Sequence, residues 1–413
     1  MKEKPIVEKV SNMEAPKSLP QLFEETAQRC SDLIALKSPS TTLTYAELEQ
    51  VSRSLAVYLP GKIGTEPCAV SILLNDGVQV ISSILGIVRA GHFYSALSLT
   101  DPPERLKKVM EDLHPRMLLT EESFLSLARQ IAPQDCVIQL FHDIPVQTTA
   151  SLATEYPPNM TLGIFFTSGS TGNPKGVLRT HQFVIHKAYI DEQDYHPGPG
   201  DKVLYSKNFT TSASVNTIFS NLLGGATLFL CDIRLENIHS FTELINNEEI
   251  SIVSIPAELL RRLLDSPEKP SFFPSVRVVL SGGDTLYRRD VERLRPLLPE
   301  NAVIIHHLSS SESGLLCRTI LQYDTPILSD VVPVGFPVPG KQVLILDQEG
   351  HIMPEGVAGE IAVRSDVIFP GYWNQPELSH SKFRTDPENP VGKVFCTGDL
   401  GYFLPDSQLV FLG

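Results

Sequence analysis

A glycine- and hydroxyl-rich segment at residues 165–181 has the residue types best suited to chemistry in this sequence. Its glycines let the backbone turn tightly and bring N–H groups close to a ligand, and its hydroxyl groups and one cation, Lys175, add further donors. That combination suits a polyphosphate. The glycines are Gly169, Gly172 and Gly176, and the hydroxyl-bearing residues are Ser168, Ser170 and Thr171. The segment is not a Walker A loop, because Pro174 stands where that motif needs its second glycine.

The hydrophobic pattern places this segment after a predicted strand at residues 163–167 and before a predicted helix at 181–189. Short apolar runs of the same kind recur, and most are separated by helix-length segments. This alternation predicts an α/β fold with parallel β-sheets flanked by helices. The other predicted strands are 69–74, 117–120, 136–140, 203–206, 226–230, 252–255, 276–280 and 303–306.

An early helix has a clear start signal. Thr44 and Glu47 have the spacing of a capping box, in which each side chain bonds the other residue's backbone N–H. Apolar residues follow at helical spacing and predict one buried face. They are Leu48, Val51, Leu55 and Leu59.

The pattern changes after about residue 335. Strands are predicted at 342–347, 359–364, 394–397 and 409–412, and helical periodicity nearly vanishes. We therefore expect a leader at 1–18, an α/β core at 19–335 and a small distorted antiparallel β-barrel at 336–413.

Composition excludes several classes of protein. The chain has 413 residues, of which 42% are hydrophobic and 20% charged, as in an ordinary globular protein. Its net charge of −14 offers no basic surface for nucleic acid or an anionic membrane. The six cysteines form no CxxC motif, and no apolar stretch of membrane-spanning length or secretory signal occurs. We expect buried, reduced cysteines and a cytoplasmic protein.

The 165–176 string, together with short motifs in a fixed order, resembles the adenylate-forming superfamily. The resemblance extends to acyl-CoA synthetases and, more closely, to the adenylation domains of nonribosomal peptide synthetases. It covers nearly the whole chain and implies the large N-terminal lobe of that fold, ending at its hinge. The supporting motifs are at 44–48, 87–91, 97–105, 221–230, 280–284, 309–313, 359–364 and 396–400.

The resemblance implies a reaction. A carboxylic acid is activated by ATP as an acyl-adenylate with release of pyrophosphate, then passed to the phosphopantetheine thiol of a carrier protein. A free-standing synthetase with CoA as acceptor is the first alternative. The second is a nucleotide- or acyl-binding module without full activity, because the lid domain and its lysine do not follow residue 413 in this sequence. We expect weak adenylation by this chain alone.

The resemblance also implies roles for individual residues. Thr167, Lys175 and Glu312 are the expected catalytic residues, and Glu312 is also the expected Mg²⁺ ligand, since Mg²⁺ suits one carboxylate plus phosphate oxygens. Asp399 is expected to accept the two ribose hydroxyls. Leu308 and Ser309 replace an aromatic residue and a glycine that usually lie beside the adenine. The full set expected to bind ATP is Thr167, Ser168, Gly169, Ser170, Thr171, Gly172, Lys175, Gly283, Asp284, Leu308, Ser309, Ser311 and Asp399.

The expected substrate pocket departs from the amino-acid-activating pattern. Ser212 stands where an aspartate pairs with the substrate's α-ammonium, and losing that charge-assisted bond costs about 1.5–3 kcal/mol. We therefore expect a substrate without a free α-amine, such as a 2-oxo, 2-hydroxy or aryl acid. Glu258 either supplies a pocket charge instead or points to solvent. The expected pocket residues are Ser212, Ala213, Asn216, Glu258, Leu280, Gly282, His307, Leu315 and Leu316.

Three other interpretations are disfavoured by missing residues. A serine hydrolase needs G-x-S-x-G after a strand, and neither 169–172 nor 309–313 fits. A dinucleotide oxidoreductase needs an early G-x-G-x-x-G, which does not occur. The neighbouring His306 and His307 lack a third metal ligand at a usual spacing, so a packed histidine is favoured over a metal site.

Overall fold

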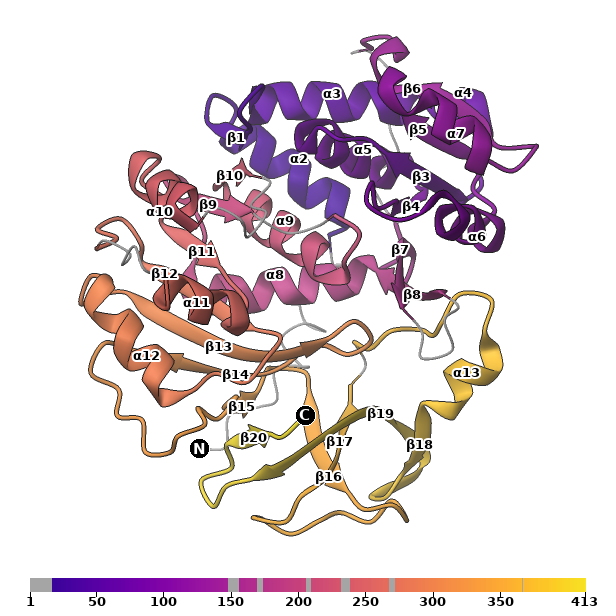
Figure 1. Cartoon of the computed structure of the whole chain (residues 1–413). Helices are drawn as coiled ribbons and strands as arrows, with labels where there is room; N and C mark the ends of the chain where they lie inside the picture. Colours follow the sequence, from indigo (N-terminus) through magenta and orange to yellow (C-terminus); the bar gives the residue numbers. More distant parts are fainter. Residues whose placement is uncertain are drawn as a thin grey trace.

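The computed structural model describes residues 17–147, 156–168, 174–205, 209–231, 238–266, 272–365 and 367–413. Two β-sheets with helices between and outside them form the larger part, and a smaller sheet lies below them (Figure 1). This arrangement is the mixed α/β lobe that the sequence predicts.

The first large sheet has six strands in the order β6-β5-β3-β4-β7-β8. All its neighbours are parallel except β8, which returns antiparallel to β7. Its strands are β3 (Ala69–Leu73), β4 (Phe93–Ala96), β5 (Met117–Thr120), β6 (Val137–Leu140), β7 (Thr161–Ser168) and β8 (Pro174–Thr180). Strand β8 was not predicted: the sequence analysis placed a strand, the glycine-rich segment and then a helix here, whereas the structure has a β-hairpin before the helix.

The second large sheet has nine strands in the order β15-β14-β13-β12-β11-β9-β10-β1-β2. Its centre is parallel, and antiparallel strands β2, β14 and β15 close its two ends. Its strands are β1 (Ile34–Lys37), β2 (Thr42–Thr44), β9 (Lys202–Tyr205), β10 (Thr227–Leu230), β11 (Ile252–Ser254), β12 (Val278–Gly282), β13 (Val303–Ser310), β14 (Gly314–Leu321) and β15 (Phe336–Pro337). Strand β13 continues beyond its predicted end at residue 306.

Helices cover both sheets. The central core joins both sheets to helices α2, α3, α5, α8 and α9, so these helices lie between the sheets, as Figure 1 shows. Helices α10 to α12 cover the outer face of the nine-stranded sheet, and α6 and α7 cover that of the six-stranded sheet. The helices are α2 (Leu19–Arg29), α3 (Tyr45–Tyr58), α4 (Pro60–Ile63), α5 (Gly77–Arg89), α6 (Pro103–Leu113), α7 (Leu125–Ile131), α8 (His181–Tyr195), α9 (Ser212–Gly224), α10 (Ile238–Asn247), α11 (Ala257–Leu264), α12 (Arg288–Leu294) and α13 (Pro376–Ser381), with short 3₁₀ turns η1 (Glu122–Phe124), η2 (Phe141–Asp143) and η3 (Arg295–Leu297).

The third sheet is wholly antiparallel and curls into part of a barrel (Figure 1). Both of its faces are buried, because Val343 and Ile345 pack toward β13 and β14 while Leu344 and Leu346 pack inside the curl. Its strands are β16 (Gln342–Leu346), β17 (Gly359–Arg364), β18 (Phe383–Asp386), β19 (Asn389–Phe403) and β20 (Leu409–Phe411). The predicted boundary at residue 335 remains a prediction; β15, just after it, still pairs with the nine-stranded sheet.

The predicted capping box is present at the start of α3. Glu47 N donates to Thr44 Oγ1 over 3.2 Å, and Thr44 N donates to Glu47 Oε2 over 2.7 Å. Leu48, Leu55 and Leu59 are buried as expected, whereas Val51 is only half-buried. Local capping and burial of one face therefore specify this helix together.

Removing the cap hydroxyl should weaken the fold measurably. We expect Thr44→Ala to lower the free energy of unfolding by about 1 kcal/mol, because the N–H of Glu47 loses its acceptor at the helix start. Urea unfolding followed by circular dichroism measures the change. Thr44→Ser keeps the hydroxyl and is the matched control; an equal loss in both variants would show that the methyl group, not the cap, matters.

The cysteines and the helices complete the description. All six cysteines are free, but only Cys30, Cys317 and Cys396 are buried, so the prediction of buried cysteines holds for half of them. None of the helices in the described ranges combines the length and apolar character needed to cross a bilayer.

Candidate active site

The β7–β8 hairpin presents the first part of the site. Thr167 on β7 pairs with Lys175 on β8, and the glycine-rich loop connects the two strands. The Thr167 hydroxyl donates to the Lys175 carbonyl over 3.5 Å. Gly169, Ser170, Thr171 and Gly172 lie outside the described residues, as does the side chain of Ser168. The hairpin thus fixes the two ends of the loop that the sequence assigns to phosphates.

Glu312 lies at the tip of a second hairpin. Strands β13 and β14 pair up to Ser310 and Gly314, which leaves a three-residue turn centred on Glu312. The turn is held by the Ser310 hydroxyl, which lies 2.6 Å from Ser313 Oγ and accepts from Ser313 N over 3.0 Å. Gly314 has a φ of +68°, a conformation that favours glycine. A side chain at the tip of such a constrained turn has a defined direction.

A short segment near Tyr372 joins these two hairpins. The Tyr372 hydroxyl donates to Glu312 Oε1 over 2.8 Å, and Trp373 N donates to Gly176 O over 2.7 Å. Lys175 Nζ lies 6.0 Å from the centre of the Tyr372 ring. The sequence analysis missed Tyr372, because no local motif marks a tyrosine whose partner lies on a distant hairpin. The segment brings Lys175 and Glu312 to one place.

Asp399 projects from an irregular stretch of β19. The pairing with β17 shifts between Glu360 and Ala362, so residues near Asp399 bulge out of the ladder. Asp399 N donates to Thr397 Oγ1 over 3.0 Å, and Gly398 has a φ of +88°. The bulge turns a half-buried carboxylate out of the small sheet.

The charges of Asp399 and Glu312 repel each other. Burial raises the pKa of Asp399, the Glu312 carboxylate raises it further, Lys382 opposes the rise, and Glu360 adds to it. Two carboxylates that repel each other favour a bound cation. Among the described residues no group of three or more His, Cys, Asp or Glu side chains could hold a metal ion. This donor set fits Mg²⁺ bound through one carboxylate and ligand oxygens better than an all-protein cage.

Neutralising Asp399 should stabilise the protein in a pH-dependent manner. Because the pKa of Asp399 is raised in the folded state, the ionised Asp399 carboxylate destabilises the folded protein relative to the unfolded chain. This destabilisation appears as the pH rises above the ordinary value of about 3.9, and it is complete above the pKa of Asp399 in the folded state. We expect Asp399→Asn to unfold at higher urea than the wild type at pH 7, with a smaller difference at pH 4.5. Exposed Asp324→Asn is the control. A pH-independent difference would contradict this account.

Most of the predicted pocket residues lie on two parts of the fold, the start of helix α9 and the strands β12 to β14. Ser212, at the start of α9, donates to Ser311 Oγ over 3.1 Å, which joins the pocket to the Glu312 turn. Gly282 pairs with His307, and a Cβ on Gly282 would come within 2.5 Å of His307 Nε2. The ring of His307 therefore covers Gly282. Leu315 and Leu316 are buried on the adjacent strand, and Leu280 is half-buried.

The remaining pocket candidates are less enclosed. Ala213 is exposed, and the Asn216 side-chain oxygen is buried without a hydrogen-bond partner in the described residues. Glu258 is exposed in the first turn of α11, which favours the solvent-facing alternative.

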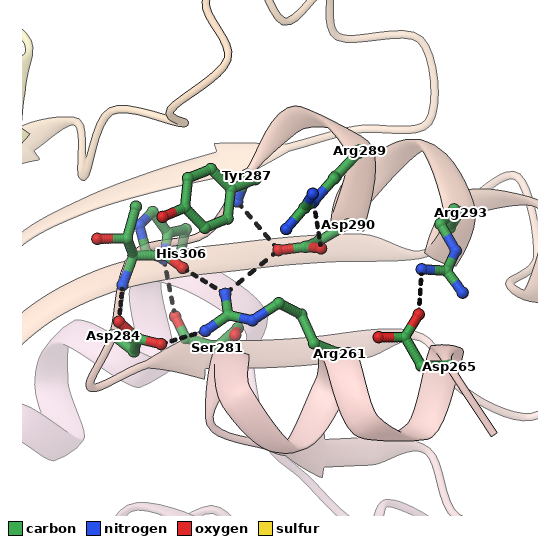
Figure 2. A network of polar contacts seen from close by, with 10 residues as sticks. Arg261, Asp265, Ser281, Asp284, Tyr287, Arg289, Asp290, Arg293 and His306 are labelled. Atoms are coloured by element: carbon green, nitrogen blue, oxygen red, sulfur yellow. Dashed lines mark hydrogen bonds and ion pairs between the residues drawn. The ribbon is translucent and has the colours of Figure 1, made fainter.

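The side expected to face adenine carries a polar network. Figure 2 shows Arg261 of α11 between Asp284 and Asp290, and Asp284 Oδ1 also accepts from Thr285 N over 2.7 Å. Gly283 is exposed, with a φ of +81°. Leu308 is 9% exposed and belongs to the core shared with the small sheet, whereas Ser309 is exposed. Asp284 is thus already engaged by protein donors.

His306 behaves as a packed residue. It is 1% exposed, its Nδ1 lies 3.2 Å from Ser281 O, and burial lowers its pKa to about 4 (Figure 2). A neutral, enclosed ring agrees with the preference for a packed histidine over a metal ligand at this pair.

Comparison with known proteins assigns the family. The AMP-binding enzyme family matches residues 23–373, and the chain belongs to that family. Among its relatives, surfactin synthase subunit 1 from Bacillus subtilis (strain 168) is 30% identical over 406 residues, or 96% of this chain and 11% of the relative. Tyrocidine synthase 1 from Brevibacillus parabrevis is 27% identical over 402 residues, 96% of this chain and 36% of the relative. The chain spans only a minor part of these relatives.

Solved structures share the fold. The nonribosomal peptide synthetase FmoA3 (S1046A) in its AMPPNP-bound form has a TM-score of 0.87 at 24% identity, covering 97% of this chain and 43% of that one. The Klebsiella oxytoca NpsA N-terminal subdomain in complex with 3-hydroxybenzoyl-AMSN has a TM-score of 0.83 at 20% identity, covering 96% of this chain and all (100%) of that one. The predicted N-terminal lobe is therefore confirmed as a fold.

Proposed function

We propose that this chain activates a carboxylic acid with ATP as an acyl-adenylate, releasing pyrophosphate, for transfer to the phosphopantetheine thiol of a carrier protein. The observation that carries the proposal is that three charged side chains from different parts of the fold come near one another. They are Lys175 of the β7–β8 hairpin, Glu312 of the turn between β13 and β14, and Asp399 of β19. Family membership supports it. FmoA3 was solved with AMPPNP, and an NpsA–ThdA fusion is described as an adenylation–PCP di-domain.

The proposed chemistry requires positioning and charge stabilisation. A carboxylate oxygen of the acid forms a bond to the α-phosphorus, and the bond from that phosphorus to the β-phosphate oxygen breaks. Lys175 and the Thr167 end of the loop neutralise and orient the phosphates, and Asp399 accepts the ribose hydroxyls. Glu312, held by Tyr372, would bind Mg²⁺, which supplies charge neutralisation to the phosphates when bound.

The proposed acid lacks a free α-amine. Ser212 is 5% exposed and makes a neutral hydroxyl–hydroxyl contact with Ser311, so an ammonium there would find no carboxylate from Ser212. A desolvated ammonium without a counter-charge is unfavourable. The small and apolar groups of Ala213, Leu315 and Leu316 fit an acid of moderate size. The cytoplasmic location and the carrier domain as acceptor rest on the sequence pattern and are part of this proposal.

An ATP–pyrophosphate exchange panel tests the substrate class. We expect exchange with 2-oxo- or 2-hydroxyisovaleric acid to exceed that with L-valine by about 10-fold or more, the worth of one charge-assisted bond. Ser212→Asp should reduce this preference or reverse it, because it supplies the missing carboxylate, whereas Ser212→Ala should keep it. Strong exchange with L-valine and none with its analogues would contradict the missing-amine proposal.

The acceptor needs its own measurement. A loading assay with a phosphopantetheinylated carrier protein and, separately, with CoA distinguishes the carrier-dependent enzyme from a free-standing synthetase. A chain that binds AMPPNP and acid but forms no adenylate under either condition would instead favour the binding-module alternative.

A further inference from the structure

Arg179 is a buried cation for which the proposed reaction has no role. It is 1% exposed and lies on β8, on the same face as Lys175 and Val177. The face of its guanidinium stacks on Phe183, with Cζ 3.6 Å from the ring centre. Its Nη2 donates to Ser310 O over 3.3 Å. One face and one donor are thereby accounted for.

Two other nitrogens of this guanidinium have no acceptor among the described residues. They are Nε and Nη1, both buried, and no carboxylate in the described ranges forms an ion pair with Arg179. Burial lowers the pKa of Arg179 to about 9, although the Glu312 carboxylate opposes the drop, so the guanidinium remains charged at neutral pH. A buried charge without a partner is strongly unfavourable, and an anion bound at this position would compensate the charge of Arg179.

Further polar groups converge on this position. Tyr94 on β4 and Arg179 on β8 both pair with Gly163 of the strand between them, and a Cβ on Gly163 would lie 3.0 Å from the Tyr94 ring. The Tyr94 hydroxyl is also buried without a partner in the described residues. Lys341 is 8% exposed, and its Nζ lies 5.7 Å from the centre of the Phe183 ring, on which Arg179 also stacks. Lys341 Nζ donates to Val367 O.

The position adjoins the predicted substrate pocket. Arg179 bonds Ser310, and the next residue, Ser311, accepts from Ser212. The pocket therefore has a neutral serine where an acidic residue would bind an ammonium, and the partly unsatisfied guanidinium of Arg179 contacts Ser310, the residue before Ser311. That charge distribution favours an acidic group on the bound ligand.

We propose that Arg179, supported by Tyr94 and Lys341, forms a buried oxyanion site beside the Glu312 turn that binds a second carboxylate of the substrate or a phosphate of the nucleotide. This inference rests on the proposed function and narrows its substrate to acids with an additional anionic group if the carboxylate is the ligand.

Calorimetric titration of the 413-residue chain tests the site. Glutarate, pentanoate and AMPPNP are titrated separately into the wild type, Arg179→Met and Arg179→Lys. We expect Arg179→Met to weaken glutarate binding by about 10- to 100-fold and leave pentanoate unchanged, with partial retention in Arg179→Lys. A loss confined to AMPPNP would identify a phosphate as the ligand of the same site.

The outcomes separate the site from the proposed function. Arg89→Met, which removes another buried arginine that is paired with Glu49 far along the chain, controls for general loosening. If Arg179→Met binds all three ligands as tightly as the wild type does, the proposed oxyanion site is wrong while adenylation stands. The same conclusion follows if Arg179→Met and Arg89→Met both lose all three ligands, because the loss then reflects general loosening of the fold. A wild type that binds none of them would overturn both.

Discussion

Replacing Glu312 with glutamine is expected to lower the rate of ATP–pyrophosphate exchange by about 100-fold or more. Glutamine keeps the size of the side chain and can still accept from the Tyr372 hydroxyl, so the turn retains its hydrogen bond. What is lost is the negative charge that would hold Mg²⁺ between the protein and the phosphates. The Mg²⁺ concentration for half-maximal exchange should rise in the same variant.

Two comparisons isolate the charge of Glu312 from its position. Tyr372→Phe removes only the hydrogen bond of 2.8 Å and should reduce exchange by about 10-fold, the worth of a bond to a charged group. Glu377→Gln changes an exposed glutamate on α13 and should have no effect. If Glu312→Gln retains more than a third of wild-type exchange, Glu312 is not the metal ligand.

Gly335→Ala is expected to lower the free energy of unfolding by about 2–5 kcal/mol, the sum of backbone strain and overpacking. Gly335 has a φ of +81°, and an added Cβ would lie 2.3 Å from Arg318 O, which is rigid backbone of β14. The same glycine pairs with Leu409, so it connects the nine-stranded sheet to the small sheet. The substitution should therefore also disturb Asp399 on the small sheet.

Gly356→Ala separates the two causes. Gly356 has a φ of +77°, but a Cβ added there would meet no atom of the described residues within 4 Å, so only the backbone strain of about 1 kcal/mol applies. Urea unfolding of both variants measures the difference. Equal shifts in the two midpoints would show that the close approach to Arg318 relaxes without cost.

The site explains a conflict between stability and binding. Burial and the neighbouring Glu312 carboxylate disfavour the charged form of Asp399 in the unliganded protein. A nucleotide with Mg²⁺ would relieve that repulsion. Binding sites often retain such locally unfavourable arrangements, because the groups that weaken the free protein are those that hold the ligand.

Much of the fold was predictable because it depends on local pattern. Most of the apolar runs buried in the parallel sheets are predicted as strands, and the Thr44–Glu47 cap sets the start of α3. The β8 strand is not predicted, because Pro174–Thr180 gains its strand conformation from pairing with β7 and with the segment at Tyr372. A strand that depends on its pairing and packing context rather than on its own residues carries a weak local signal.

The sequence by itself determined the family and the candidates for chemistry, because motif order and the residue types in each motif are properties of the chain. Only the tertiary structure decided which of them meet. Tyr372 reaches Glu312, and Arg179 reaches Ser310, through contacts between distant hairpins. Burial then decides their chemistry, because the guanidinium of Arg179, which would be a solvated charge on the surface, is enclosed without a paired carboxylate among the described residues, and we propose that it favours an anion.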